Sequence, residues 1–246
     1  MPDPLKISRR AGNPPTVTRD KNSVPPLRGG AKQKEQGRMK IYDISQELLS
    51  AAVYPGDPTP HTERIFSIPS GDLYNLTVLS LCAHNGTHVD APCHFLDGGA
   101  DIASMPLERF VGAVYLTTRV GELTATGAAA ILDAARDSFA HSPLAALDPD
   151  GQGRRIVIRG DATVTLPCAT ALAAAGIYLL GTESQSVGPL DSPMAVHLAL
   201  LSQGIALLEG LRIPAYIPDG TYLLAAQPIS VSGADGSPCR AILIAP

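Results

Sequence analysis

Three histidines and one aspartate fall within eleven residues of this chain, at His84, His88, Asp90 and His94. Imidazole and carboxylate groups are ligands that zinc, manganese and iron accept. Three such donors together with a water molecule form an open metal site, which is the catalytic type rather than the closed structural type. The clustering therefore predicts a catalytic metal site in this segment.

The residues between these donors indicate how the backbone runs. Asn85-Gly86-Thr87 and Pro92 oppose a helix, so a strand next to a tight turn is the better geometry. In an extended His88-Val89-Asp90, the first and third side chains project from one face of the strand. Gly86 permits the sharp bend that brings His84 to the same point.

Other residues that could do chemistry give weaker signals. Isolated histidines are more often structural or exposed than metal ligands, and we expect this of His61 and His141. The four cysteines form no Cys-x-x-Cys pair, which indicates reduced thiols rather than a zinc ribbon or a disulfide framework. The chain also lacks Gly-x-Ser-x-Gly, which argues against a serine enzyme of the α/β-hydrolase class.

Composition argues against several classes of function. The 246 residues suit one domain, and 45% hydrophobic with 17% charged residues is a globular balance. Aromatic residues make up 4% and the net charge is −4, which opposes a nucleic-acid-binding surface. No stretch approaches the roughly 20 apolar residues of a membrane helix, and no signal-peptide core lies near the start. We therefore expect a cytoplasmic protein that acts on a small molecule, without nucleic-acid or membrane partners.

Residues 1–38 differ from the rest of the chain. They hold six prolines and nine Lys or Arg against three Asp or Glu, a local charge of +6 that leaves −10 for residues 39–246. Their few apolar residues follow no helical or strand period, so they cannot bury enough surface to order themselves. The leading interpretation is a disordered, basic, Pro-rich extension. A true start at Met39 and a basic arm that contacts a partner are the alternatives.

Residues 39–246 predict one α/β domain, because strands and helices alternate in its second half. We expect strands at 40–46, 76–82, 114–120, 155–159, 177–181, 205–209, 221–231 and 241–245, the second of them apolar on both faces and buried. We expect alanine-rich helices at 127–137, 168–175 and 193–203, with Gly176 and Gly204 ending the last two. The chemistry of Tyr54-Pro55-Gly56-Asp57-Pro58 predicts a turn.

The pattern His84-x-Gly86-Thr87-His88-x-Asp90-x-Pro92-x-His94 resembles the signature of the metal-dependent cyclase family, which includes bacterial kynurenine formamidases (arylformamidases). The likeness extends over roughly residues 40–245. Its further stretches are Tyr42-Asp43-Ile44-Ser45, Pro55-Gly56-Asp57, 180–187, 204–209 and 234–241. The resemblance implies a single domain with a mixed β-sheet core and flanking helices, of the swivelling β/β/α type.

The resemblance also implies roles for individual residues. His84, His88 and Asp90 would hold a first zinc, and Asp90 would bridge to a second zinc completed by His197 and Glu209, with manganese as an alternative metal. His94 would be the acid–base residue, and the protein would form a homodimer or a larger assembly. Because Glu209 follows the apolar run 205–208, its carboxylate loses hydration and needs a cationic partner. The plainer alternatives are a water-facing Glu209 and a core-packed His197.

The implied reaction is zinc-dependent hydrolysis of N-formyl-L-kynurenine to L-kynurenine and formate, a step of tryptophan degradation. Zinc lowers the pKa of its bound water to about 7, so hydroxide is available at neutral pH. His94 would then protonate the leaving nitrogen.

Three departures from the formamidase pattern affect the expected substrate pocket. Tyr54 stands where the formamidase carries a substrate-flanking Trp, Gly188 stands where Asp is usual, and the stretch 159–169 is short. They leave open another amide, lactam or lactone hydrolase, such as one that opens an isatin ring. A metal-binding protein without catalysis is the third alternative, and the presence of His94 argues against it.

Overall fold

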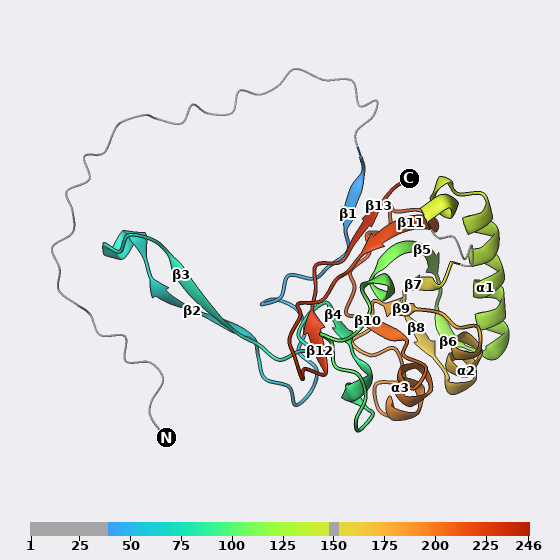
Figure 1. The fold of residues 1–246 in the computed structure, drawn as a ribbon, viewed down its shortest axis with the longest axis horizontal. Helices are drawn as coiled ribbons and strands as arrows, with labels where there is room; N and C mark the ends of the chain where they lie inside the picture. Colours follow the sequence, from blue (N-terminus) through green and yellow to red (C-terminus); the bar gives the residue numbers. More distant parts are fainter. Residues whose placement is uncertain (1–38, 148–152) are drawn as a thin grey trace, which may run out of the picture. The chain divides into compact units, whose positions relative to one another are not determined.

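The computed structural model describes residues 39–147 and 153–246 (Figure 1). The extension expected at residues 1–38 lies outside the described residues. Within the described part, nine strands form one mixed sheet in the order β1-β13-β11-β5-β7-β9-β10-β4-β12. In that order they span Ile41–Asp43, Ile242–Ile244, Gly220–Ala225, Val111–Thr118, Arg155–Arg159, Leu179–Thr182, Ala206–Glu209, His88–Asp90 and Gly236–Pro238.

The sheet has a parallel centre and antiparallel ends. Strands β5, β7, β9 and β10 run parallel, because helices return the chain to the same edge between β7, β9 and β10. Antiparallel partners flank them, with β11, β13 and β1 on one side and β4 and β12 on the other. This arrangement confirms the α/β prediction with a mixed sheet.

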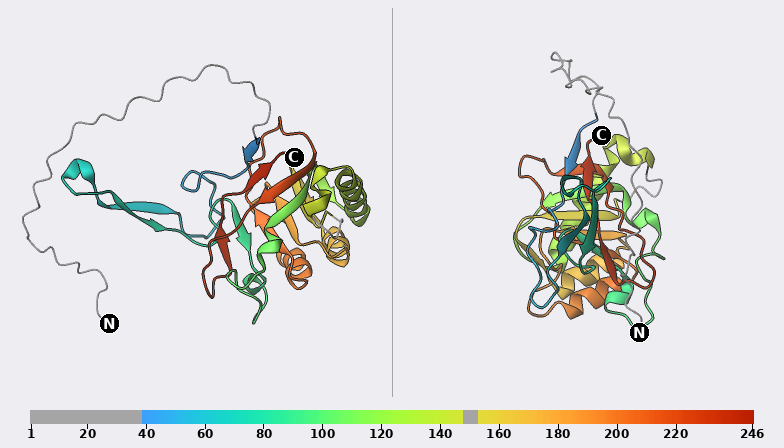
Figure 2. Two further views of the ribbon diagram at one scale, coloured as in Figure 1. Left: turned by 45° about the horizontal axis from the view of Figure 1, so that its top comes forward. Right: turned by 90° about the vertical axis from the view of Figure 1, so that its left-hand side faces the viewer.

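In the described part of the chain, three helices pack against one face of the sheet (Figure 2). They are α1 (Ala125–Ala140), α2 (Leu166–Ala174) and α3 (Met194–Leu201). Threonine side chains cap α1 and α2 at their starts, since Thr124 accepts from the Gly127 amide and Thr165 from the Cys168 amide. Gly176 and Gly204 follow α2 and α3 with φ of 68° and 66°, as the sequence predicted for helix stops. None of the helices described here is long and apolar enough to cross a membrane.

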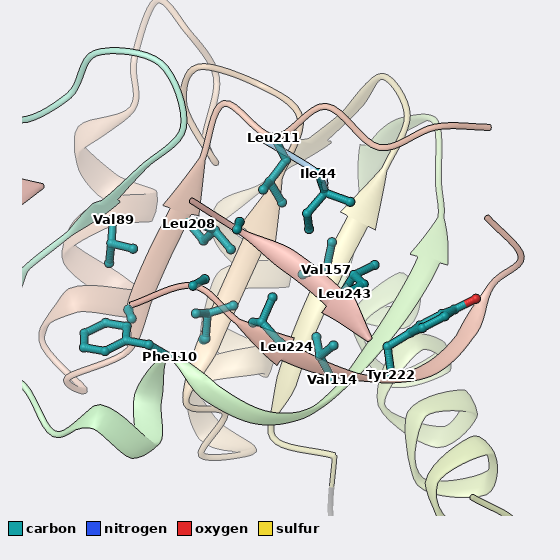
Figure 3. Packing of buried hydrophobic residues seen from close by; sticks show 14 of the residues in the cluster. Ile44, Val89, Phe110, Val114, Val157, Leu208, Leu211, Tyr222, Leu224 and Leu243 are labelled. Atoms are coloured by element: carbon teal, nitrogen blue, oxygen red, sulfur yellow. The ribbon is translucent and has the colours of Figure 1, made fainter. Parts of the chain in front are cut away.

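Alternation along the strands separates two hydrophobic cores. On β7, Ile156 and Ile158 pack among the residues beneath the helices, whereas Val157 belongs to the core on the opposite face. On β10, Leu207 lies on the helix side and Leu208 on the other. Figure 3 shows the core on the face away from the helices, in which Val157 and Leu208 lie among side chains from distant strands.

Smaller elements complete the described chain. The two strands β2 (His61–Phe66) and β3 (Leu76–Ser80) form an antiparallel hairpin, and β6 (Gly121–Leu123) pairs in parallel with β8 (Ala162–Val164). Single 3-10 turns occur at Ile68–Ser70, Pro92–His94, Leu107–Arg109 and Pro143–Leu147.

The expected burial of the strand at 76–82 is wrong. Every residue of β3 is exposed, and Leu79 is 61% accessible. An apolar pattern on both faces is typical of a buried strand. The pattern does not indicate whether other segments of the same chain pack against those faces. Strands β2, β6, β8 and β12 were not expected. Strand β12 can contain Pro238 because it lies at the edge of the sheet.

Replacement of a leucine between sheet and helices should be costly. Leu180 on β9 is fully buried, so Leu180→Ala should lower the free energy of unfolding by about 2–5 kcal/mol. Leu79→Ala on the exposed hairpin is the matched control and should change it by less than about 0.5 kcal/mol. Urea denaturation of both variants measures the difference. Equal losses would contradict the assignment of the two environments.

Candidate metal and active site

Neighbouring strands β4 and β10 place three of the predicted ligands on one face of the sheet. The strands are antiparallel, and Glu209 lies directly opposite His88. Val89 and Leu208 belong to the core on the far side of the sheet. Alternation therefore directs His88, Asp90 and Glu209 toward the face that the helices cover.

Helix α3 brings His197 to the same place. Its Nε2 lies 3.2 Å from Glu209 Oε1 and 3.7 Å from Asp90 Oδ2. Its Nδ1 lies 2.9 Å from the carbonyl oxygen of Pro193, one turn earlier in the chain. A carbonyl can only accept, so Nδ1 carries the hydrogen and Nε2 is the nitrogen that faces the carboxylates.

His88 is oriented in the same manner. Its Nδ1 donates to the carbonyl oxygen of Gly86 over 3.0 Å. Its Nε2 lies 3.3 Å from Asp90 Oδ1 and 3.5 Å from Glu209 Oε2. With Nδ1 protonated, the free electron pair of a neutral Nε2 would point at negative oxygens, so a proton or a metal cation must lie between them.

The turn before β4 supplies His84. Asn85 Oδ1 accepts from the Cys82 amide over 2.8 Å, and Gly86 adopts φ of +66°, a left-handed conformation that favours glycine. The chain thereby doubles back, and His84 Nδ1 lies 2.8 Å from Asp90 Oδ1. The bend that the sequence predicted at Gly86 is present.

Burial makes these contacts electrostatically strong. His88, Asp90, His197 and Glu209 are each at most 3% accessible. Burial alone would raise the pKa of Asp90, but hydrogen bonds with His84 and His88 hold that pKa well below its usual value. Burial opposes a charge on His88, yet Asp90 and Glu209 outweigh it and raise its pKa well above 6.5. The pKa values of His84 and His197 are raised against burial in the same way.

The donor atoms form two groups that share Asp90. His84, His88 and Asp90 offer ligand atoms within 4.8 Å of one another, and so do Asp90, His197 and Glu209. Asp90 Oδ2 is buried without a hydrogen-bond partner among the described residues, which leaves one carboxylate oxygen available to a cation. Nitrogen and carboxylate donors with this unsatisfied oxygen fit divalent cations such as zinc or manganese.

His94 lies beside these groups. It ends the 3-10 turn Pro92–His94 that follows β4, and its ring centroid is 4.1 Å from that of His84. Its Nδ1 lies 3.1 Å from Asp235 Oδ2. A third set of close donors, His84, His94 and Asp235, results from this contact.

A cavity of about 240 Å³ opens onto this cluster. Its walls include four of the predicted site histidines and Glu209, together with Tyr54, Asp57, Phe95, Gln185, Ser186 and Pro193. A larger hollow of about 630 Å³, beside β1, contains no histidine. Chemistry rather than size therefore marks the smaller cavity as the candidate site.

The structure brings all the predicted site residues to this cavity or to its immediate wall. Asp90 contacts three of the histidines that line it, and Tyr54 lines it while its hydroxyl donates to the carbonyl oxygen of Leu190 over 3.0 Å. His61 and His141 are exposed, as expected. Sequence reasoning gave no role to the Asp235 carboxylate or to Phe95, Gln185 and Ser186. The resemblance covered Asp235 and Ser186, but nothing in their spacing connected them to the histidines.

Proteins of known structure share this fold, and proteins of known sequence resemble this chain over most of its length. Solved structures with the same fold include one described as a potential metal-dependent hydrolase with cyclase activity, with a TM-score of 0.63, 24% identity, and coverage of 85% of this chain and 99% of that one. Isatin hydrolase A from Labrenzia aggregata, bound to benzyl benzoate, has a TM-score of 0.66 at 19% identity and covers 84% and 94%. These likenesses define the class as an α/β protein of the fold seen in those hydrolases.

Sequence comparison is more specific. Residues 42–189 match the family model described as "Putative cyclase". Over 214 residues, the chain is 35% identical to a kynurenine formamidase of Maricaulis maris, which covers 83% of this chain and 97% of that protein. The chain therefore belongs to the cyclase family, as its sequence signature predicted.

Asp90→Asn should weaken metal binding. An amide keeps the volume but loses the charge, and its NH₂ group would face imidazole nitrogens now directed at Asp90. We expect zinc affinity to fall at least about 10-fold, as measured by chelator competition. Asp133→Asn, whose carboxylate is 75% exposed, is the control and should bind zinc like the parent. Unchanged affinity in Asp90→Asn would remove Asp90 from the ligand set.

Zinc binding should release protons and weaken in acid. The raised pKa values of His84, His88 and His197 mean that, in the metal-free protein, these rings keep their protons to a higher pH than a free imidazole does. Zinc must displace them, so affinity should decrease as the pH falls from about 8 to about 6. Calorimetry in buffers of different ionisation enthalpy measures the released protons. A flat affinity over this range would contradict the protonated cluster.

Proposed function

We propose that the protein is a metal-dependent amidohydrolase that cleaves N-formyl-L-kynurenine to L-kynurenine and formate. One observation carries the proposal: four side chains of ligand type line one cavity with His94, and the fifth, Asp90, contacts three of their imidazoles. The relative from Maricaulis maris supports the same chemistry, since it is named a kynurenine formamidase.

The residues present fit two divalent ions. His84, His88 and Asp90 would hold one, and Asp90, His197 and Glu209 would hold the other. When bound, such ions acidify a water molecule and polarise a substrate carbonyl. Glu209 Oε1 also accepts from the Val187 amide over 2.8 Å, which fixes the carboxylate before any ion arrives.

His94 is the residue that moves a proton. Hydrolysis adds the hydroxyl of water to the formyl carbon, breaks its bond to nitrogen and requires a proton on the leaving aniline nitrogen. His94 Nδ1 is engaged with Asp235, so Nε2 is the atom that takes a proton from water and delivers it to that nitrogen. The ring lies on the cavity wall and belongs to neither of the two donor groups that share Asp90.

The cavity suits a small aromatic substrate. Its 240 Å³ falls just below the roughly 300–1,000 Å³ that is common for sites of drug-sized ligands. Phe95 and Tyr54 give it two aromatic walls, and the hydroxyl of Tyr54 is held by Leu190, which fixes its ring. The formamidophenyl ketone of the substrate can stack there while its formyl group lies at the histidines.

A related ring-opening hydrolase is the second candidate. Tyr54 and Gly188 depart from the formamidase pattern, and a β-carbon at Gly188 would lie 3.1 Å from Val196 Cβ. The aspartate usual at that position would therefore press on helix α3, which carries His197, so this chain packs that helix differently beside the site. A cyclic amide or lactone of isatin type is the substrate class that such a pocket would take instead.

Turnover assays discriminate these candidates. We expect zinc-loaded protein to hydrolyse formylkynurenine, chelator to abolish this activity, and His94→Ala to lower kcat by about 10²- to 10⁴-fold. His141→Ala, whose side chain is 78% exposed, is the control and should match the parent.

Absence of formylkynurenine turnover with zinc bound would overturn the formamidase assignment. Turnover of isatin or another lactam would then support the second candidate. Zinc binding without turnover of any of these would indicate a metal-binding protein instead.

A further inference from the structure

Asp235 occupies a central position between two histidines of different function. It lies immediately before β12, which pairs with β4, and its carbonyl oxygen accepts from the Ala91 amide over 2.9 Å. The backbone at Asp235 is thus fixed to the end of the strand that carries His88 and Asp90. Its position relative to the site depends on sheet pairing rather than on a free loop.

One carboxylate oxygen contacts both rings. Asp235 Oδ2 lies 3.0 Å from His84 Nε2 and 3.1 Å from His94 Nδ1. A carboxylate only accepts, so each of these nitrogens carries its hydrogen toward Asp235. The two rings consequently lie against each other, with centroids 4.1 Å apart and planes 32° apart.

The second nitrogen of each ring does not contact Asp235 and can take a different partner. On His84 the remaining nitrogen is Nδ1, which lies 2.8 Å from Asp90 Oδ1 within the first ligand group and gives up its own proton when an ion binds there. On His94 the remaining nitrogen is Nε2, on a ring that lines the cavity. A single oxygen thus selects the tautomer of a candidate metal ligand and that of the candidate acid–base residue together.

The neighbouring residue supports this arrangement. A β-carbon on Gly236 would lie 2.8 Å from His84 Cε1 and 2.7 Å from the carbonyl oxygen of Val89. Only glycine therefore lets the strand approach closely enough for Asp235 to reach His84. Gly236 therefore permits the close approach of the strand, and the Asp235 carboxylate makes the contact with His84.

We propose that Asp235 is a positioning residue that fixes the tautomers of His84 and His94 through one shared oxygen. The predicted effect of Asp235 on catalysis rests on the proposed hydrolase function. Its predicted effect on the two histidine tautomers does not. An aspartate that itself ligates a metal with His94 is the competing role for the same donors.

Imidazole ¹⁵N spectra of the zinc-loaded protein test the structural part without any substrate. We expect the parent to show His94 with its hydrogen on Nδ1 and His84 with its hydrogen on Nε2. In Asp235→Ala, the Nδ1 hydrogen of His94 should be lost in favour of the Nε2 tautomer common in water. An identical His94 tautomer in parent and Asp235→Ala would overturn the proposal, whether or not the protein cleaves formylkynurenine.

Metal binding and kinetics provide the second readout. We expect Asp235→Ala to weaken zinc about 10- to 100-fold with unchanged stoichiometry, and to lower kcat by a similar factor while KM stays within about 3-fold. Asp235→Asn keeps an accepting oxygen and should recover part of both losses. Asp97→Ala, at an exposed position on the loop after His94, is the matched control and should behave like the parent.

The outcomes separate the two proposals. Loss of one zinc equivalent in Asp235→Ala would make Asp235 a ligand and overturn the positioning role. An active parent with unchanged kcat and zinc affinity in Asp235→Ala would also overturn it. An inactive parent with the expected tautomers and zinc affinities would overturn only the hydrolase assignment. Thermal unfolding of each variant verifies that the half-buried substitution leaves the fold intact.

Discussion

Two carboxylates buried on adjacent strands impose the main constraint on this structure. Asp90 and Glu209 lie on one face of β4 and β10 and are almost inaccessible to water. Moving charged groups from water into a protein interior costs several kcal/mol each unless cations compensate them. The protein places three imidazoles around them, from a turn, from β4 and from α3. The need to compensate two buried carboxylates therefore accounts both for the site and for the way the turn, β4 and α3 meet around it.

The mixed sheet explains how such a site can form. Parallel strands β9 and β10 bring α3 over the helix-covered face, and antiparallel β4 then extends that face past the helix. At this border, strand side chains meet helix side chains with room left for a cavity. Backbone carbonyls of Gly86 and Pro193 hold the rings of His88 and His197, so the imidazoles are oriented before any ligand binds.

The sequence predicted the parts of the site that are local and the parts that a family signature covers. His84, His88 and Asp90 could be grouped from strand alternation and one glycine bend. His197 and Glu209 followed from the resemblance and from the burial expected after an apolar run. Asp235 could not be found, because its contact with His94 spans 141 residues and depends on the pairing of β12 with β4. The central strands and the helices were predicted near their true positions because their hydrophobic patterns are strong. Apolar periodicity at 76–82 predicted a strand correctly but not its exposure, which depends on what else covers it.

The order of the site residues along the chain has a consequence for biosynthesis. The ionisable cluster runs from His84 to Asp235, and the contact from Asp235 arrives only with β12, which follows the other residues of the cluster in the chain. A growing polypeptide on the ribosome thus carries its histidines and buried acids long before their last partner is made. The complete cluster can form only after the segment that holds Asp235 has left the ribosome. The contact of Asp235 with His84 and His94 is consequently a late event in biosynthesis.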